Sequence, residues 1–331
     1  MYYFLPDYYE KFHCTAQSCR DNCCIGWEIM IDDNSWELYR QLPGAIGEKL
    51  RRCVCDDPND RHFILQENGR CPFLNEENRC EIILHIGEEA LCDICDEHPR
   101  FSIECEGWQE TGLGLCCEEA ARLILSPAEA AGFLCSQTPS TSPEPPLPEA
   151  LQKLLDRRWK LFTLLQNRDY PLPTRLQALL LAEEAGKPMD AAALSAALSF
   201  LSLQEYLSPE WPALLSAGSQ FLSLPPEEQA HRRQDFENAL GKCMVEYEHL
   251  AVYFLFRYYL AAYFDHRPKE KVRLTAAAVS LIELLALADY TQTGTLPDFS
   301  RRLRIAQLFS KEVEYNEDAM EGFKELLNLE D

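Results

Sequence analysis

Hydrophobic spacing predicts helices through the second half of the chain. From Ala150 the segment A-L-Q-K-L-L-D-R-R-W-K-L-F-T-L-L places apolar residues at i, i+3, i+4 and i+7, the spacing of one helical face. Similar spacing predicts further helices at about residues 173–186, 190–206, 209–223, 226–265, 268–291 and 298–328. The stretch A-V-Y-F-L-F-R-Y-Y-L-A-A-Y-F is apolar nearly all round, which is typical of a helix at the buried centre of a bundle.

The first third of the chain predicts shorter and less regular elements. Asp32 to Ser35 offer N-cap side chains for the helix that W-E-L-Y-R-Q-L predicts. Asn68-Gly69 is a dipeptide that favours a tight turn after a strand. Strands are predicted at residues 26–31 and 62–67, and helices at 36–42, in the second half of 81–95, and at 118–126.

Cysteines are concentrated in this first third. The chain has 15, and all but Cys243 lie before residue 136. The segment C-T-A-Q-S-C-R-D-N-C-C-I-G-W begins at Cys14, and later cysteines stand in C-P-F-L, R-C-E-I, L-C-D-I-C and C-C-E-E. Sets of thiolates of this kind select zinc or iron–sulfur clusters. Only Cys92 and Cys95 show the C-x2-C spacing usual for zinc, so an iron–sulfur cluster is favoured, with zinc as the alternative. A metal with a purely structural role stays open.

Two domains joined by a linker are expected from this pattern. Residues 136–149 contain five prolines together with serine and threonine, a composition that forms extended linkers. We therefore predict a cysteine-rich metal-cluster domain at 1–135, a linker at 136–149 and an α-helical domain at 150–331. The predicted fold class is mainly α: an irregular cysteine-rich domain with short strands, followed by an all-α helical bundle.

Charge and hydropathy narrow the classes of partner. The net charge is −23, which opposes binding to phosphate-rich nucleic acid. An acidic surface suits a basic substrate such as a lysine-bearing protein, although acidity also serves solubility alone. No apolar run reaches the roughly 20 residues of a membrane span. The N-terminal residues lack a secretion signal, so with so many cysteines we expect a reducing, cytoplasmic location.

The cysteine layout resembles that of the flagellin lysine-N-methylases, within a wider group of zinc- or iron-chelating cysteine-cluster proteins. The resemblance is carried by F-H-C…S-C-x3-C-C-I-G-W, C-P-F-L…R-C-E-I, L-C-D-I-C-D-E-H-P-R and C-C-E-E-A-A-R. It continues, more weakly, in Y-E-H-L-A-V-Y-F-L-F-R at 247–257 and Q-L-F-S-K-E-V-E-Y at 307–315. The resemblance implies methylation of flagellin lysines from S-adenosylmethionine by a protein that carries an iron–sulfur cluster.

The resemblance also implies a set of metal ligands. The candidates are Cys14, Cys19, Cys23, Cys24, Cys71, Cys80, Cys95 and Cys117. Eight thiolates exceed the four that one cubane needs, so one centre or two are possible. Cys92 and Cys116 are extra cysteines beside expected ligands, and they leave open which member of each neighbouring pair binds. We predict ordinary buried thiols at the remaining positions, Cys53, Cys55, Cys105, Cys135 and Cys243.

Methyl transfer to lysine needs an amine that has lost its proton, because the free side chain has a pKa of about 10.4. The aromatic helix offers Glu248, His249, Tyr247 and Tyr253 as catalytic candidates, with Glu248 pairing to an arginine as the alternative. No G-x-G-x-x-G loop follows a strand, so the residues that bind S-adenosylmethionine are not located. The competing function is a non-enzymatic metal-cluster protein whose helical half is a docking module.

Overall fold

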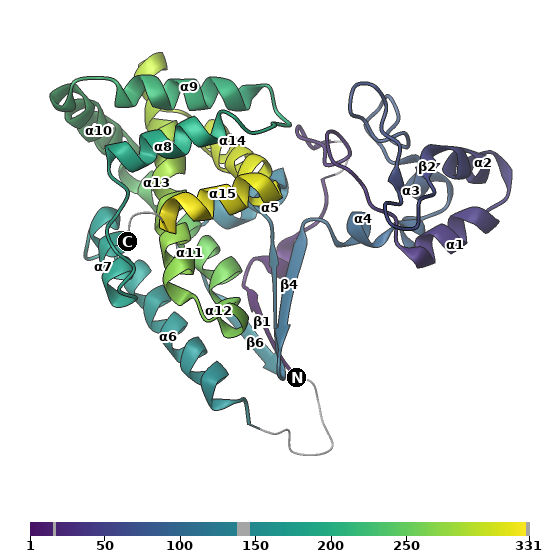
Figure 1. Cartoon of the computed structure of the whole chain (residues 1–331), viewed down its shortest axis with the longest axis horizontal. Coiled ribbons are helices and arrows are strands. Elements are labelled where there is room, and N and C mark those ends of the chain that lie inside the picture. The colour runs from purple at the N-terminus through teal and green to yellow at the C-terminus, as the bar shows by residue number, and fades with distance from the viewer. Residues whose placement is uncertain (16–17, 138–145, 329–331) are drawn as a thin grey trace. The chain divides into compact units, whose positions relative to one another are not determined.

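The computed structural model describes residues 1–15, 18–137 and 146–328, and it divides into two compact units (Figure 1). We call the first the helical unit; it comprises Met1–Phe12, Ser102–Cys116 and Ala120–Asp331. The second, the cysteine-rich unit, comprises His13–Phe101 and Cys117–Glu119. Among the described residues every helix is too short or too polar to span a bilayer.

A four-stranded sheet belongs to the helical unit. Its order is β4-β5-β1-β6, with β1 (Tyr2–Pro6) parallel to β5 (Trp108–Leu113) and antiparallel to β6 (Phe133–Gln137). The edge strand β4 (Arg100–Cys105) enters from the cysteine-rich unit. Side chains of β5 alternate between buried and half-buried positions, because successive residues of a strand point to opposite faces. The described residues from 150 onward form only helices, as predicted, but they share their unit with this sheet, which precedes residue 138. The molecule is mainly helical, as predicted.

The remaining elements of the helical unit are helices. They are α5 (Glu118–Leu125, whose first two residues belong to the cysteine-rich unit), α6 (Glu149–Leu165), α7 (Leu172–Ala182), α8 (Ala191–Leu201), α9 (Glu210–Leu222), α10 (Pro226–Leu240), α11 (Val245–Tyr259), α12 (Ala262–Asp265), α13 (Pro268–Thr293), α14 (Phe299–Phe309) and α15 (Glu317–Asn328), with short 3-10 turns at Tyr9–Lys11 and Gly241–Met244. The long helix α13 packs against α9 and α11 (Figure 1). Most side chains of α11 are buried, which confirms its predicted place at the centre.

Two long predicted helices are interrupted. The predicted helix at 226–265 ends first at Gly241, whose φ of +47° leaves the helical region, and α11 starts after a 3-10 turn. The predicted helix at 298–328 is divided by a π-helical turn, Ser310–Glu314. Such turns insert one residue into a helix and occur often at functional sites.

The cysteine-rich unit contains short elements only. They are α1 (Asp33–Gln41), α2 (Gly44–Cys53), β2 (Val54–Cys55), β3 (His62–Phe63), α3 (Glu81–His85), a 3-10 turn (Glu88–Ala90) and α4 (Asp93–Glu97). The Asp32 side chain accepts a hydrogen bond from Ser35 N, which confirms the predicted cap. The strand predicted at 26–31 is not formed, since Ile25 and Met30 make isolated bridges only. The helix predicted in the second half of 81–95 is divided into the 3-10 turn and α4, because Leu91 and Cys92 between them are extended.

The two units divide the chain differently from the predicted domains. Strands β1, β5 and β6 precede residue 138 but pack with the helices, because β1 pairs with strands more than a hundred residues away. Most of the predicted linker at 136–149 falls on residues 138–145, which lie outside the described residues. The linker therefore stays a prediction.

A buried ion pair joins the sheet to α6. Arg158 Nη1 donates to Glu110 Oε2 at 2.6 Å, and Trp108 Nε1 donates to Glu110 Oε1 at 2.7 Å. The two charged side chains are almost fully buried, and the Arg158 guanidinium lies over the Phe4 and Phe256 rings at 5.6 and 5.9 Å. Buried charges need such partners, because the apolar interior does not solvate them.

We expect Glu110→Gln to lower the free energy of unfolding of the helical unit by about 3 kcal/mol, because it leaves the buried Arg158 without its counter-ion. Urea denaturation followed by circular dichroism measures the change. Glu149→Gln is the matched control, since Glu149 pairs with Lys153 on an exposed surface and its loss costs about 0.5 kcal/mol or less. Equal effects of the two substitutions would contradict the assignment of Glu110 to the core.

Candidate functional site

Backbone contacts in the cysteine-rich unit bring distant cysteines together. Cys71 N donates to Cys24 O at 2.8 Å, and Gly26 N donates to Gly69 O at 2.8 Å in the turn that precedes Cys71. Cys80 forms an isolated bridge with Leu74 just beyond. These contacts place three predicted ligands, from three separate loops, in one region of the unit.

The thiols of these cysteines shift one another's pKa. The pKa of Cys24 is raised by a hydrogen bond with Cys23 and by burial, and further by the charges of Cys71 and Cys80. Burial raises the pKa of Cys71 to about 12, with Cys80 and Cys92 adding to the effect. Each thiolate thus disfavours the next, which is the expected behaviour of ligands grouped without the cation that would stabilise them.

Cys92 and Cys95 complete this group from the two ends of the first turn of α4. Cys95 N donates to Cys92 O at 2.9 Å, and a hydrogen bond between the two side chains lowers the pKa of Cys92 and raises that of Cys95. The charges of Cys24 and Cys71 also raise the pKa of Cys95. The sequence left open whether Cys92 is a ligand. The structure places Cys92 with the predicted ligands. We call Cys23, Cys24, Cys71, Cys80, Cys92 and Cys95 the thiol group.

The thiol group borders the hydrophobic core of the unit. Cys71 and Cys92 are buried within that core, and Cys24, Cys80 and Cys95 pack against it. None of the cysteines that the structure describes forms a disulfide. Thiols gathered in this way fit a thiolate-ligated metal centre chemically, because soft sulfur donors select zinc, copper(I) or iron–sulfur clusters.

The spacing of the sulfur atoms bears on the kind of metal. A zinc ion with bonds of about 2.3 Å brings four sulfurs within about 3.8 Å of one another. Among the described residues, the one set of three candidate ligands with donor atoms within 4.8 Å is Glu28, Asp60 and His62. The thiol group is therefore more open than a single zinc ion requires. A cubane suits a wider spacing, because its four thiolates bind separate iron atoms.

The other predicted ligands lie at the margin of the thiol group or have no printed contact with it. Cys19 is half-buried, and the charges of Glu118 and Cys23 add to burial in raising its pKa. Cys14 is exposed and Cys117 is half-buried. Cys116, by contrast, is buried in the helical unit, where the Tyr315 hydroxyl hydrogen-bonds to its thiol. Of the remaining cysteines Cys105 is buried as predicted, Cys53, Cys55 and Cys243 are half-buried, and Cys135 is exposed on the solvent-facing strand β6 against the prediction.

The four catalytic candidates on α11 do not share one site. A small pocket in the helical unit is lined by His249 and Tyr253, which stand one helical turn apart on the same face. It holds about 250 Å³ of empty space, including the part open to solvent. The other lining residues, mostly apolar, are Pro6, Tyr8, Ile124, Ala131, Phe133, Val252 and Phe256. The structure thus brings together two of the four candidates.

His249 is neutral and has a defined tautomer. Its Nε2 lies 2.8 Å from the Glu129 carbonyl oxygen, which can only accept a hydrogen bond, so Nε2 carries the proton. Nδ1 is then an acceptor, and it is buried with no hydrogen-bond partner. Burial lowers the pKa of His249 below its ordinary value. A buried imidazole with an open lone pair can accept a proton.

Glu248 points instead to two arginines. Arg168 Nη2 donates to Glu248 Oε1 at 2.8 Å, and Arg175 Nη1 donates to Glu248 Oε2 at 2.5 Å. Burial opposes the ionisation of this carboxyl, but both guanidinium groups outweigh it, so the pKa of Glu248 lies below its usual value. The arrangement matches the alternative role of Glu248 as an arginine partner. Tyr247 is also buried, near the charged groups of Glu283 and Glu246.

Tyr253 belongs to a buried polar group that includes Glu314. The Tyr253 hydroxyl lies 3.2 Å from Glu314 Oε1, and Tyr258 donates to the same oxygen at 2.8 Å. Arg257 Nε lies 3.1 Å from it as well, and the Glu314 side chain is fully buried. Glu314 lies in the segment Q-L-F-S-K-E-V-E-Y of the resemblance, but no role was predicted for it. The π-helical turn brings it to α11 from 61 residues away along the chain.

Comparisons with known proteins point to one family. Residues 190–331 match the family model for the FliB lysine N-methylase C-terminal domain. The lysine-N-methylase of Salmonella typhimurium is 28% identical over 165 residues, which cover 46% of this chain and 39% of that protein. The flagellar biosynthetic protein FliU of Salmonella muenchen is 27% identical over 131 residues, 38% of this chain and 78% of that protein. No solved structure matches the chain.

The fold thus defines a class of protein in which a cysteine-rich unit precedes a helical C-terminal domain. Helices α8 to α15 lie in the region that matches the FliB lysine N-methylase C-terminal domain. The match spans about two fifths of the length of the curated lysine-N-methylases, since it covers 39% of each.

The lowered pKa of His249 predicts a pH dependence of stability. The unfolded chain binds a proton at this residue near pH 6.5, whereas the folded chain binds it only at lower pH, so the free energy of unfolding falls as the pH drops below about 6.5. We expect His249→Gln to flatten this fall between pH 7 and 5. Urea denaturation at several pH values measures it, and the other histidines, present in both proteins, cancel. An identical slope in the two proteins would contradict the burial of His249.

Proposed function

We propose that the chain is a protein-lysine N-methyltransferase that acts on flagellin, takes its methyl group from S-adenosylmethionine and carries an iron–sulfur cluster. The observation that carries the proposal is the match of residues 190–331 to the FliB lysine N-methylase C-terminal domain. The net charge of −23 suits a substrate that presents lysines.

The pocket on α11 supplies groups that methyl transfer needs. A lysine ammonium must lose a proton before its nitrogen can attack a methyl group. His249 Nδ1 is the unpartnered acceptor in that pocket, and it takes the proton while Nε2 stays bound to the Glu129 carbonyl. Tyr8, Phe133 and Phe256 also line this pocket, and aromatic rings attract cations. His249 is therefore the proposed base, and Tyr253 the polar group beside it.

The pocket does not account for the methyl donor. S-adenosylmethionine is a drug-sized ligand, and sites for such ligands enclose about 300 Å³ or more. The pocket between α11 and the strands falls short of that size, because its 250 Å³ of empty space includes the part open to solvent. We therefore assign no residue of this chain to the methyl donor, whose bound sulfonium would supply the electrophilic methyl group.

The thiol group is the proposed metal centre. Cys23, Cys24, Cys71, Cys80 and Cys95 are the predicted ligands within it, and Cys92 joins them by position. Their wide spacing favours an iron–sulfur cluster, with zinc as the alternative. The bound metal would stabilise the fold of a unit that has only short helices and strands, whatever part the metal plays in catalysis.

A non-enzymatic metal-binding protein is the second candidate function. The observation in its favour is the small size of the α11 pocket, which offers no room for the methyl donor. In that case the helices would serve as a docking module. Incubation with labelled S-adenosylmethionine and flagellin separates the two functions, because only the methyltransferase labels the flagellin.

If the thiol group is the metal centre, replacing one of its cysteines should release bound metal. We expect Cys71→Ser to lower the iron or zinc bound per chain, and its resistance to a chelator, by more than about tenfold, because serine is a poor ligand for both metals. The protein is purified without oxygen, and its absorbance and metal content are measured. Cys135→Ser, on an exposed strand of the other unit, is the control. Full metal content in Cys71→Ser would exclude the thiol group as the site.

If His249 is the base, its replacement should slow methyl transfer near neutral pH, and high pH should restore the rate. His249→Gln should reduce transfer of labelled methyl groups to flagellin by about 100-fold near neutral pH, since a positioned base contributes at least this much. The loss should shrink as the pH approaches 10, where lysine loses its proton without help. His231→Gln is the control, because His231 is exposed on α10. A His249→Gln protein with the normal rate would place the base elsewhere.

A further inference from the structure

The strand β6 leaves part of its backbone free for another chain. It is the last strand of the four-stranded sheet in the helical unit, and it pairs with β1 on one side (Figure 1). Asp7 N donates to Gly132 O at 3.0 Å, at the residue pair that precedes β6. Hydrogen-bonded pairs alternate with unbonded pairs along an antiparallel ladder, so Leu134 is bonded to β1. Phe133 and Cys135 therefore turn their N–H and C=O groups to the open side.

The sequence of β6 lacks the residues that usually protect a sheet edge. Natural sheets place charged side chains or proline on an open edge, because unpaired backbone groups bind other chains. The opposite edge strand, β4, carries Arg100 and Glu104, which are both exposed. The sequence of β6 is F-L-C-S-Q, and its residues from Leu134 onward are exposed. This edge is thus suited to pair with an added strand.

The open edge begins at the pocket on α11. Phe133 is the first residue of β6, and it lines that pocket together with His249. Its ring stacks on Phe162 at 4.8 Å and lies 6.4 Å from the ring of Trp159, which is 55% exposed. Side chains directly opposite on neighbouring strands have Cβ atoms about 5 Å apart. A lysine opposite Phe133 on an added strand can therefore extend its four-carbon stem along these rings towards the pocket.

The charge at this end of the edge suits a basic segment. The carboxylate of Asp7 lies beside Gly132, where a Cβ atom would come within 2.7 Å of Asp7 Oδ2. Asp7 is exposed. Burial, and secondly the charge of Asp7, raise the pKa of Tyr8, which lines the pocket. An exposed negative charge thus lies next to both the edge and the pocket.

We propose that the open edge of β6 binds an extended, lysine-bearing segment of the protein substrate as an added strand and so brings its lysine to the pocket. The inference rests on the proposed function and adds how the substrate is held. Strand addition gains affinity from main-chain hydrogen bonds, here with Phe133 and Cys135, whereas pockets for alternate side chains give specificity. The enzyme can therefore accept lysines in different sequence surroundings.

Cys135→Pro tests the role of the backbone, because proline removes the N–H on the open side and leaves the bonds to β1 in place. The reference protein is Cys135→Ser, which loses the same thiol but keeps that N–H. Transfer from labelled S-adenosylmethionine is measured over a range of flagellin concentrations. We expect the KM for flagellin to be about tenfold higher in Cys135→Pro than in Cys135→Ser, because a substrate carbonyl is left unpaired. The effect should fall on KM rather than kcat.

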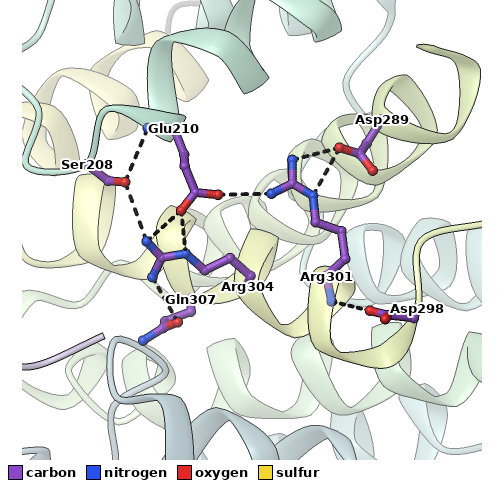
Figure 2. Close-up of polar contacts among 7 residues, drawn as sticks. All are labelled: Ser208, Glu210, Asp289, Asp298, Arg301, Arg304 and Gln307. Atoms are coloured by element: carbon purple, nitrogen blue, oxygen red, sulfur yellow. Dashed lines mark hydrogen bonds and ion pairs between the residues drawn. The ribbon is translucent and has the colours of Figure 1, made fainter. Parts of the chain in front are cut away.

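Arg301→Met controls for loss of stability. Figure 2 shows Arg301 in a charged network of α9, α13 and α14, where it pairs with Asp289 at 2.7 Å and Glu210 at 3.0 Å. None of the residues of this network lines the pocket or belongs to β6. The variant should lower the melting temperature and keep the wild-type KM for flagellin. A rise in KM equal to that of Cys135→Pro would overturn the role of the edge, because binding would then follow stability.

Amide hydrogen exchange tests the same edge without a substitution. The N–H groups of Phe133 and Cys135 should exchange rapidly in the free protein and more slowly when flagellin is added. The N–H of Leu134, which is bonded to β1, should be protected in both states. This measurement decides the question even if Cys135→Pro fails to fold.

Three outcomes would overturn the inference. Flagellin labelling by the wild type, with equal KM in the two Cys135 variants and no added protection of β6, would overturn strand addition and leave the proposed function standing. A wild type that does not label flagellin would overturn the proposed function and this inference with it. A wild-type dimer that Cys135→Pro dissociates would show that the edge pairs with a second copy of the chain instead of a substrate.

Discussion

The grouping of thiols in a unit with little regular structure is the constraint on which the architecture depends. The helices of the cysteine-rich unit are short, and its described cysteines form no disulfide. A core of this size buries limited apolar surface, and small domains of this kind usually need a disulfide or a metal. Five cysteines of the thiol group lie in or against that core, and neighbouring cysteines help to raise the pKa of all of them except Cys92. A metal ion or cluster would turn this mutual repulsion into attraction.

In the helical unit the main constraint is the burial of polar groups on the central helix α11. Each charged side chain of α11 meets an opposite charge: Glu246 with Arg302, Glu248 with two arginines, and Arg257 with Glu314. Such pairing satisfies the groups and fixes the neighbouring helices in register. His249 Nδ1, by contrast, is buried without a hydrogen-bond partner, and His249 lines a pocket. The contrast separates the structural polar residues from the candidate for chemistry.

Local patterns predicted the helices and the ligand types, whereas long-range pairing escaped them. Helical spacing and the Asp32 cap are local features, so these elements could be predicted. Strands β1 and β5 are short and pair across more than a hundred residues, and the sheet was therefore missed. Tyr253 and His249 were identified on the aromatic helix, but the role of Glu314 depends on a contact across 61 residues. Cys92 carried a usable signal, its C-x2-C spacing with Cys95.

The central claim is that sulfur atoms of the cysteine-rich unit surround a metal. X-ray absorption at the iron and zinc edges of the anaerobically purified chain tests it most directly, because the fine structure reports the atoms bound to the metal and their distances. The account predicts a shell of sulfur atoms, at about 2.3 Å if the metal is zinc, and iron neighbours if it is a cluster. A shell dominated by nitrogen and oxygen, or a protein without either metal, would contradict it.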